Sequence, residues 1–521
     1  MMHGGRVRTL DRVGRLAQGV AIRHGRVVAV GSDADVLCWA HSGDEIIDLH
    51  GRTVLPGLID AHAHVELGTY ANSWWTDVRS VGRAECLNRL KRAAAEPGSG
   101  WVVGQATYGQ DLPDRDELDA IAPATPLLIR WSMHLLVANS VALRKARIDR
   151  TFSPPTGSRV RRDENGEPTG VVEEGFDLFP VPYPDVDWLT RNLRRELLTS
   201  FAPYGVTTIH ELPATTSGTH AWQLLARQAE LPARIILNPI VAPGHQPTIA
   251  DVDHFLDAGF VTGFGDEWLR LGALKVFVDG DEAAAYSYEQ LSDAPAGWGL
   301  LTQSLNDLAN LLSACFRARQ QVWMHAIGDA AQDLALESIA QAVTRSPGWE
   351  HRTRIEHIAN HGIRADQLDR MRRLGVIPVP TAAFMHVTAP EQTGPGDCYP
   401  YRRLIDAGLR PPGNSDTAGT QPFATNPWFG ISRMANRRNK KGEPLSPGQR
   451  VDVAEAITTY TAHGAFAGFE EQTKGSIEIG KLGDLAVFGR DPVNCDPARI
   501  EDVTADVTVV GGHIVHDRSG T

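Results

Sequence analysis

Two histidines separated by a single residue, His62 and His64, close an apolar stretch that begins at Leu55. Side chains alternate between the two faces of a strand, so both imidazoles would point the same way and could bind one cation at the strand end. A chance pair on a half-buried strand is the alternative interpretation. The apolar lead-in and the preceding Pro56 and Gly57 favour a metal site, and ligands at later strand ends would decide the question.

Four more polar residues stand in or just after later apolar stretches: Lys275, His325, His357 and Asp416. The lysine is unusual because apolar residues flank it, although a single lysine could simply extend its ammonium group to solvent. The two histidines, this lysine and the three other residues fall on five predicted strands. Six such residues on five strands indicate one shared site rather than separate accidents.

A regular alternation of helices and strands would bring these residues together. After the strand that ends in the two histidines, helical patterns from residue 188 onwards alternate with strand patterns. Those strands cover residues 205–210, 233–241, 269–280, 321–325, 353–358, 375–380 and 411–416. Such alternation predicts a parallel sheet, and eight units close into a (β/α)8 barrel, in which catalytic groups lie at the C-terminal strand ends.

The predicted fold class is α/β, with a (β/α)8 TIM-like barrel at its centre. Short strand patterns near both termini, split by Gly-containing turns, predict one small β-sandwich from residues 1–55 and 475–521. The barrel would occupy residues 56–474. Within it, residues 66–185 interrupt the alternation and predict an inserted α+β subdomain, in which a helix begins near Asn139.

The overall composition narrows the choice of partner. The 521-residue chain has a formal net charge of −12, which argues against nucleic acid or an anionic membrane as partner, because such binding needs clustered Lys and Arg. Its five cysteines form no CxxC pair, which indicates a reducing compartment. We see no signal peptide and no long apolar span. We therefore expect a cytoplasmic protein that acts on a small molecule, and a homodimer remains open.

Several motifs resemble one known family over nearly the whole chain. They are Pro56-Gly57-Leu58-Ile59-Asp60-Ala61-His62-Ala63-His64, the stretch from His134 to Asn139-Ser140-Val141-Ala142-Leu143, Gly205-Val206-Thr207-Thr208 and Lys474-Gly475-Ser476-Ile477. As a set they are similar to the metal-dependent amidohydrolase superfamily, and within it to amidohydrolase family 3. This YtcJ-like branch includes N-substituted formamide deformylases.

The resemblance implies a metal centre with one or two zinc or similar divalent ions. Its residues would be His62, His64, Lys275, His325, His357 and Asp416. Imidazole and carboxylate groups suit such ions, whereas an ammonium group cannot bind them, so the lysine would act as an N6-carboxylated bridge. The metal would polarise a carbonyl group and lower the pKa of water to about 7, and Asp416 would be the general base and acid. Asp329 and Glu356 adjoin these residues and are candidates to orient them.

Five other polar residues are candidates for binding the substrate: Glu174, His134, His210, Asp281 and Glu282. Glu174 could instead be a surface carboxylate. His134 and His210 could instead be histidines buried in the core. Asp281 and Glu282 stand in a loop where similar sequences usually have a Ser- and Gly-rich segment. Two carboxylates near the site would favour a neutral or basic amide over a substrate that carries a free carboxylate.

The predicted function is metal-dependent hydrolysis of a non-peptide C–N bond, in an N-acyl, N-formyl or cyclic amide. A lyase or isomerase reaction on the same metal centre is one alternative. A catalytically silent barrel that serves as a scaffold is another. A silent protein would be expected to lose some of the six metal-centre residues, and the chain has a suitable residue at every position.

Overall fold

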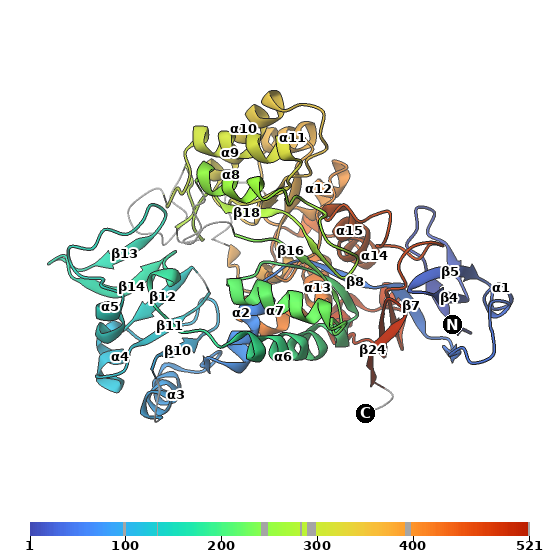
Figure 1. The fold of residues 1–521 in the computed structure, drawn as a ribbon, viewed down its shortest axis with the longest axis horizontal. Helices are drawn as coiled ribbons and strands as arrows, with labels where there is room; N and C mark the ends of the chain where they lie inside the picture. Colours follow the sequence, from blue (N-terminus) through green and yellow to red (C-terminus); the bar gives the residue numbers. More distant parts are fainter. Residues whose placement is uncertain are drawn as a thin grey trace.

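The computed structural model describes most of the chain. The described residues are 1–96, 100–132, 134–240, 248–281, 284–288, 299–390 and 397–518. They form a mixed α/β fold in which two parallel sheets lie between an inserted sheet and two sheets made from the terminal regions (Figure 1). In this part of the chain, none of the helices combines the length and the apolar character needed to cross a membrane.

Two four-stranded parallel sheets carry the candidate site. The first has the order β17 (Leu269–Leu271), β16 (Arg234–Leu237), β15 (Val206–Glu211) and β8 (Leu58–Ala63). The second has the order β18 (Leu274–Phe277), β19 (Val322–His325), β20 (Arg354–Glu356) and β21 (Ile377–Val379). All of these strands except β17 are buried along their whole length, as is usual for parallel strands covered on both faces.

The predicted strand 269–280 is wrong as a single element, because the chain divides it into β17 and β18. Gly272 stands at the division, where a side chain would lie 2.2 Å from the Asn238 amide oxygen. That oxygen also accepts the Ala273 N–H at 2.8 Å. The Lys275 N–H then bonds to the Pro239 carbonyl at 3.0 Å, so the start of β18 lies beside the residues that follow β16. Asn238 therefore turns the chain from one sheet to the next.

The predicted strand 411–416 is also wrong as a regular strand, since this described segment is not assigned to one. It nevertheless runs beside β8, where the Asp416 N–H bonds to the His62 carbonyl at 2.8 Å and the His64 N–H to the Thr417 carbonyl at 2.9 Å. Pro411 and Pro412 supply no N–H groups, which limits the ladder. The segment still brings Asp416 to the end of β8.

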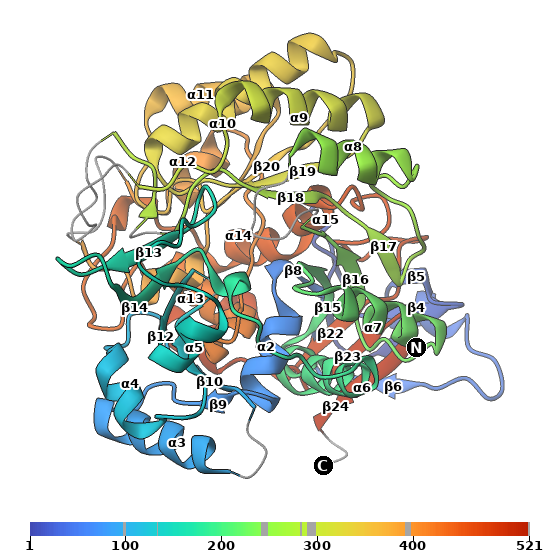
Figure 2. The same ribbon diagram turned by 60° about the vertical axis from the view of Figure 1, so that its left-hand side comes forward.

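Helices cover the outside of these sheets (Figure 2). They are α6 (Val186–Glu196), α7 (Thr216–Arg227), α8 (Ile249–Asp257), α9 (Leu305–Ala318), α10 (Asp329–Arg345), α11 (Ala365–Leu374) and α12 (Tyr401–Asp406). On α9, Leu308 and Leu312 lie one turn apart and share one buried apolar cluster with Val276 of β18 and Met324 of β19. This packing fixes α9 against the strands that carry the site.

The terminal regions share one six-stranded sheet. Its order is β24 (His513–Asp517), β23 (Val507–Val510), β22 (Leu485–Phe488), β7 (Thr53–Pro56), β2 (Arg6–Arg8) and β3 (Leu16–Ala17). A second, four-stranded sheet has the order β5 (Arg26–Gly31), β4 (Gly19–Arg23), β1 (Met2–His3) and β6 (Ile47–Asp48). Strand β7 leads through Gly57 into β8, and a side chain at Gly57 would lie 2.1 Å from Thr207 Oγ1. The shared sheet thus anchors the strand that carries His62.

The stretch between β8 and α6 contains its own six-stranded sheet. The order is β13 (Arg159–Arg162), β14 (Pro168–Glu173), β12 (Leu135–Ala138), β11 (Leu127–Arg130), β10 (Val102–Gln105) and β9 (Thr76–Asp77). Helices α2 (Val65–Ser73), α3 (Arg83–Ala95), α4 (Arg115–Ile121) and α5 (Ser140–Lys145) belong to the same stretch. Asn139 caps α5 through the Ala142 N–H at 2.8 Å, where a helix start was predicted.

Candidate metal centre

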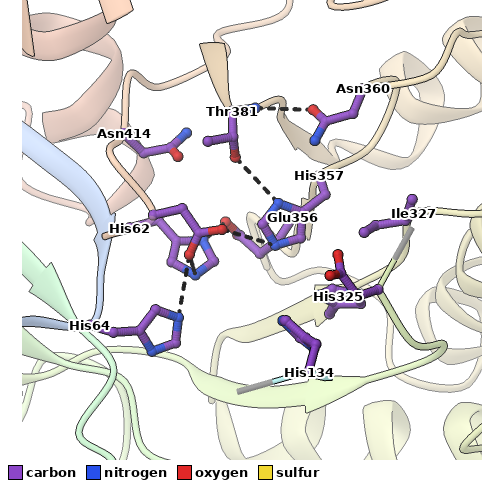
Figure 3. Close-up of polar contacts among 12 residues, drawn as sticks. His62, His64, His134, His325, Ile327, Glu356, His357, Asn360, Thr381 and Asn414 are labelled. Atoms are coloured by element: carbon purple, nitrogen blue, oxygen red, sulfur yellow. Dashed lines mark hydrogen bonds and ion pairs between the residues drawn. The ribbon is translucent and has the colours of Figure 1, made fainter. Parts of the chain in front are cut away.

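Three side chains from distant parts of the sequence converge into a group that can hold a metal ion. His62, His357 and Asp416 each offer a ligand atom, and these atoms all lie within 4.8 Å of one another. Asp416 Oδ1 is 3.4 Å from both His62 Nε2 and His64 Nε2, and Oδ2 is 3.7 Å from His357 Nε2. Figure 3 labels the three imidazoles. One carboxylate therefore faces three imidazoles.

Backbone geometry aims two of these residues. His357 and Asp416 have φ angles of 65° and 45°, in the left-handed region that residues other than glycine seldom adopt. His357 directly follows β20, and its N–H bonds to the Val379 carbonyl at 2.8 Å. Local strain of this kind persists where the surrounding structure holds it, and it is concentrated at functional sites.

His325 and Lys275 complete the predicted group. His325 ends β19, and its ring centroid lies 4.8 Å from that of His357. Lys275 of β18 is 1% exposed, and burial lowers its pKa to about 8 against the opposing effect of the Glu356 and Asp416 charges. All six residues predicted from the sequence thus lie in one buried region of the structure.

The donor atoms fit a cation. Burial lowers the pKa of His64 to about 4 and that of His357 to about 3, so both imidazoles are neutral at physiological pH. Burial opposes ionisation of Asp416, but the neighbouring histidines hold its pKa well below the usual range. Among the described residues, buried His62 Nε2 has no hydrogen-bond partner. Lone pairs from neutral imidazoles and an ionised carboxylate therefore face one another, and a bound cation would satisfy them.

Glu356 fixes the ring of His62 from behind, as the sequence suggested. The His62 Nδ1–H donates to Glu356 Oε2 at 2.5 Å, which leaves Nε2 as the ligand nitrogen. Arg354 donates to both oxygens of Glu356, at 2.7 and 2.9 Å, and to the Ala61 carbonyl at 2.7 Å. Sequence reasoning missed Arg354, although its position two residues before Glu356 on a strand places both on one face.

The other predicted orienting residue acts elsewhere. Asp329 accepts the Tyr288 N–H at 3.0 Å at the start of α10. The carboxylate beside His325 is instead Asp279, whose Oδ1 lies 3.7 Å from His325 Nε2. Asp279 also accepts the N–H groups of Ile327 and Gly328 at 3.0 and 2.8 Å, which ties the end of β18 to the loop after β19. Asp279 stands shortly after the apolar strand β18, and this position could have identified it as a candidate from the sequence.

A small cavity opens above the metal-centre residues. Its wall includes His64, His325, His357 and Asp416 together with Tyr108, His134 and Asp281 from outside that group. Phe384, Ile327 and Ala418 supply an apolar part of the wall. The cavity therefore combines a polar side with an apolar side next to the candidate metal ligands.

Three predicted substrate-binding residues lie at this cavity or directly behind it. His134 Nδ1 is 3.0 and 2.8 Å from the two oxygens of Glu174, which is buried and not a surface carboxylate. The Asp281 N–H donates to Glu174 Oε1 at 2.9 Å, and the Tyr108 hydroxyl donates to Asp281 Oδ2 at 3.0 Å. Glu282 lies outside the described residues.

His210 does not share this location. It is fully buried on β15, where Arg354 donates to its Nδ1 at 3.2 Å and the Trp323 ring stacks on it at 5.9 Å between centroids. This location supports the second of the two interpretations that its sequence left open, a histidine buried in the core. The His210 ring lies in the interior between the strands, where the charged Arg354 and the Trp323 ring enclose it.

The sequence pattern of the amidohydrolase family, the Amidohydro_3 group, matches residues 45–516. The chain belongs to the amidohydrolase family. It is therefore an enzyme that hydrolyses carbon–nitrogen bonds other than peptide bonds, which confirms the class predicted from the motifs. The match extends over both parallel sheets and over the inserted sheet.

Relatives of this amidohydrolase align along its full length. The N-substituted formamide deformylase of Arthrobacter pascens is 28% identical over 551 residues, which cover 100% of this chain and 99% of that protein. A crystal structure of an uncharacterised metal-dependent hydrolase from Pyrococcus horikoshii OT3 superposes with a TM-score of 0.72, at 22% identity, over 95% of this chain and 98% of that one. Atrazine chlorohydrolase TrzN from Arthrobacter aurescens TC1, crystallised with zinc, gives a TM-score of 0.57 at 15% identity, over 99% and 95%. The two crystal structures show a shared fold.

Proposed function

We propose that this amidohydrolase uses one or two zinc-like ions to hydrolyse the C–N bond of an N-acyl, N-formyl or cyclic amide. The observation that carries the proposal is the set of neutral imidazoles around the ionised Asp416 carboxylate, in which His62 Nε2 has no hydrogen-bond partner among the residues that the structure describes. These atoms are oxygen and nitrogen donors of the kind that zinc prefers. Similarity to a formamide deformylase over the whole chain supports an amide as the substrate.

The residues that would hold the metal are the six around Asp416. His62, His64, His325 and His357 supply imidazole nitrogens, Asp416 supplies a carboxylate, and Lys275 would contribute after carboxylation. Burial lowers the pKa of Lys275 to about 8, which raises the share of neutral amine, the form that reacts with carbon dioxide. When bound, the ions would polarise the substrate carbonyl and favour ionisation of water near neutral pH.

Asp416 would move the proton in this reaction. Its carboxylate is ionised, so it can accept a proton from the attacking water while the water oxygen bonds to the acyl carbon. The C–N bond then breaks, and the same proton passes from Asp416 to the leaving nitrogen. An N-acyl amine gives an amine and a carboxylic acid, a formamide gives an amine and formic acid, and a cyclic amide opens to one product that carries both an amine and a carboxyl group. Backbone bonding of Asp416 to the His62 carbonyl keeps the carboxylate at the end of β8 during this transfer.

The same proposal includes closure of the two parallel sheets into one (β/α)8 barrel. A bridge between Ile240 and Lys275 links the sheets on one side. On the other, the segment around Gly413 bonds to β8, and the Asn414 amide donates to the Pro380 carbonyl just beyond β21 at 3.1 Å. We likewise propose a barrel over residues 56–474, with 66–185 inserted, and a sandwich of 1–55 with 475–521. Whether two chains form a homodimer stays a prediction.

The cavity wall supports a neutral or basic amide as the substrate. Asp281 lines the cavity, while the nearby Glu174 carboxylate is paired with His134. The Asp281 carboxylate adds negative charge to this wall, which would repel a free carboxylate on the substrate and attract an amine portion. N-formyl amines without a carboxylate meet this requirement.

Elemental analysis of protein purified without chelator tests the proposal together with an amide screen. We expect one to two equivalents of divalent metal per chain and activity of the zinc-loaded protein on at least one N-formyl, N-acyl or cyclic amide. His62→Ala should lower metal content and activity together, because it removes one ligand. A wild-type protein that holds no stoichiometric metal would contradict the metal centre, and one that binds metal but hydrolyses no amide would contradict the substrate class.

A further inference from the structure

His134 and Glu174 form a paired unit beside two neighbouring strands of the inserted sheet, β12 and β14. His134 precedes β12 and Glu174 follows β14, and these strands are antiparallel neighbours with Leu135 opposite Glu173. The Glu174 N–H also donates to the His134 carbonyl at 2.7 Å. The backbone thus fixes the two residues side by side before their side chains interact.

The Glu174 carboxylate is held from two directions. His134 Nδ1 lies 3.0 and 2.8 Å from its oxygens, and the Asp281 N–H donates to Oε1 at 2.9 Å. Glu174 is 7% exposed and has a φ of 50°, a left-handed conformation that is unusual for glutamate. Such a conformation is retained where a side chain has to be held in one direction.

The edge of the His134 ring that carries Nε2 faces the cavity. The two nitrogens of an imidazole lie on different edges of the ring, so pairing of Nδ1 with Glu174 leaves Nε2 for another partner. His134 lines the cavity together with His64, His325 and Asp416, and its ring centroid is 5.5 Å from that of His325. Figure 3 shows the His134 side chain beside His325 and directed toward the metal-centre residues.

We propose that His134 is a catalytic residue whose Nε2–H donates a hydrogen bond to the acyl oxygen of the bound amide, and that Glu174 is the residue that positions it. The inference rests on the proposed amide hydrolysis. When water adds to the acyl carbon, the acyl oxygen gains negative charge, and a donor fixed in advance stabilises that charge. Both oxygens of the Glu174 carboxylate lie within 3.0 Å of His134 Nδ1, and this ion pair favours the imidazolium form, in which Nε2 also carries a proton. The inserted subdomain therefore contributes a catalytic group as well as part of the cavity wall.

Two substitutions at His134 separate contact with substrate from contact with Glu174. The amide nitrogen of glutamine falls near the position of Nε2, and that of asparagine near Nδ1. His134→Gln keeps a donor for the acyl oxygen, whereas His134→Asn keeps only the partner of Glu174. We expect His134→Asn to lose about 10²-fold or more in kcat with a smaller change in KM, as for removal of other donors to a developing charge. His134→Gln should retain clearly more kcat than His134→Asn, with metal content unchanged in both.

Each other outcome counts against the inference. Equal kcat in the two variants, or a more active His134→Asn, would overturn substrate contact through Nε2. Loss of metal in either variant would show that His134 is a metal ligand. Should His134→Asn fail to fold, Glu174→Gln is the second variant, expected to lower kcat with metal retained, and a wild-type kcat would overturn the positioning role. His220→Gln, on the exposed face of α7, is the matched control with no expected change.

The failure of this inference is distinguishable from failure of the proposed function. A zinc-loaded wild-type enzyme that cleaves no amide contradicts the proposed function before any variant is compared. An active wild-type enzyme whose His134 variants do not follow the expected order contradicts only the role of His134. Metal content gives a readout that does not depend on turnover.

Discussion

Glu356→Gln should weaken both the fold and the metal centre, because one carboxylate serves a buried arginine and a metal ligand. Arg354 and Glu356 are each fully buried, and Arg354 donates to both carboxylate oxygens. Breaking a buried ion pair by removal of one charge costs about 3–5 kcal/mol, since the remaining charge stays in a region of low polarity. We expect a loss of stability in this range for the metal-free variant.

The same substitution should loosen metal binding through His62. The 2.5 Å contact between His62 Nδ1 and Glu356 fixes which nitrogen faces the metal, and a neutral amide would hold the ring less firmly. Loss of a carboxylate behind a histidine ligand typically costs 10–100-fold in metal affinity, or about 1.4–2.8 kcal/mol. Urea denaturation of the metal-free proteins would measure the first effect, and competition with a chelator the second.

Glu350→Gln is the matched control for this experiment. It makes the same chemical change in an ion pair with Arg352, but the Glu350 side chain is 67% exposed. An exposed pair contributes about 1 kcal/mol or less, and no described contact joins Glu350 to the metal centre. Wild-type metal affinity in Glu356→Gln, together with a large loss of stability, would refute the orienting role and leave Glu356 as a partner of Arg354 alone.

Three further predictions concern the reaction itself. Asp416→Asn should keep at least one metal ion yet lose about 10²-fold or more in turnover, measured with saturating amide; near-wild-type turnover would assign proton transfer to another group. Lys275→Ala should lose the second metal ion, and short carboxylates added to the assay should restore part of the activity. An unmodified lysine in density for the metal-loaded enzyme, with one ion bound, would argue against the bridge. In a matched pair of amides with and without a free carboxylate, kcat/KM should favour the partner without it, and Asp281→Asn/Glu282→Gln should reduce that preference. A preference for the carboxylate, unchanged in the double variant, would rule out selection by this loop.

The helices and strands around the site could be predicted wherever one local pattern determines them. The strand that ends in His62 and His64, and the strands before His325 and His357, are apolar stretches that the structure assigns to β8, β19 and β20. The stretch 269–280 is equally apolar, but the division at Gly272 depends on Asn238, which is distant in sequence. Contacts of that kind leave no trace in a local pattern. The divided strand and the irregular segment before Asp416 were therefore predicted as simple strands.

The residues of the candidate site, too, could be predicted only where a local sequence pattern determines their position. His62, His64, Lys275, His325, His357 and Asp416 were grouped from the sequence because all six stand on or near strand ends, and parallel strands bring their C-terminal ends to one side of a sheet.

His210 has the same local signature and lies instead against Trp323 and Arg354, so a position at the end of an apolar strand is not sufficient to identify a site residue. The neighbours that a ring meets across the sheet determine which histidine faces the cavity. Arg354 illustrates the converse. It was missed because its importance comes entirely from contacts with Glu356, Ala61 and His210, on three different strands, and these contacts link β20 to β8 and β15 beneath the metal centre.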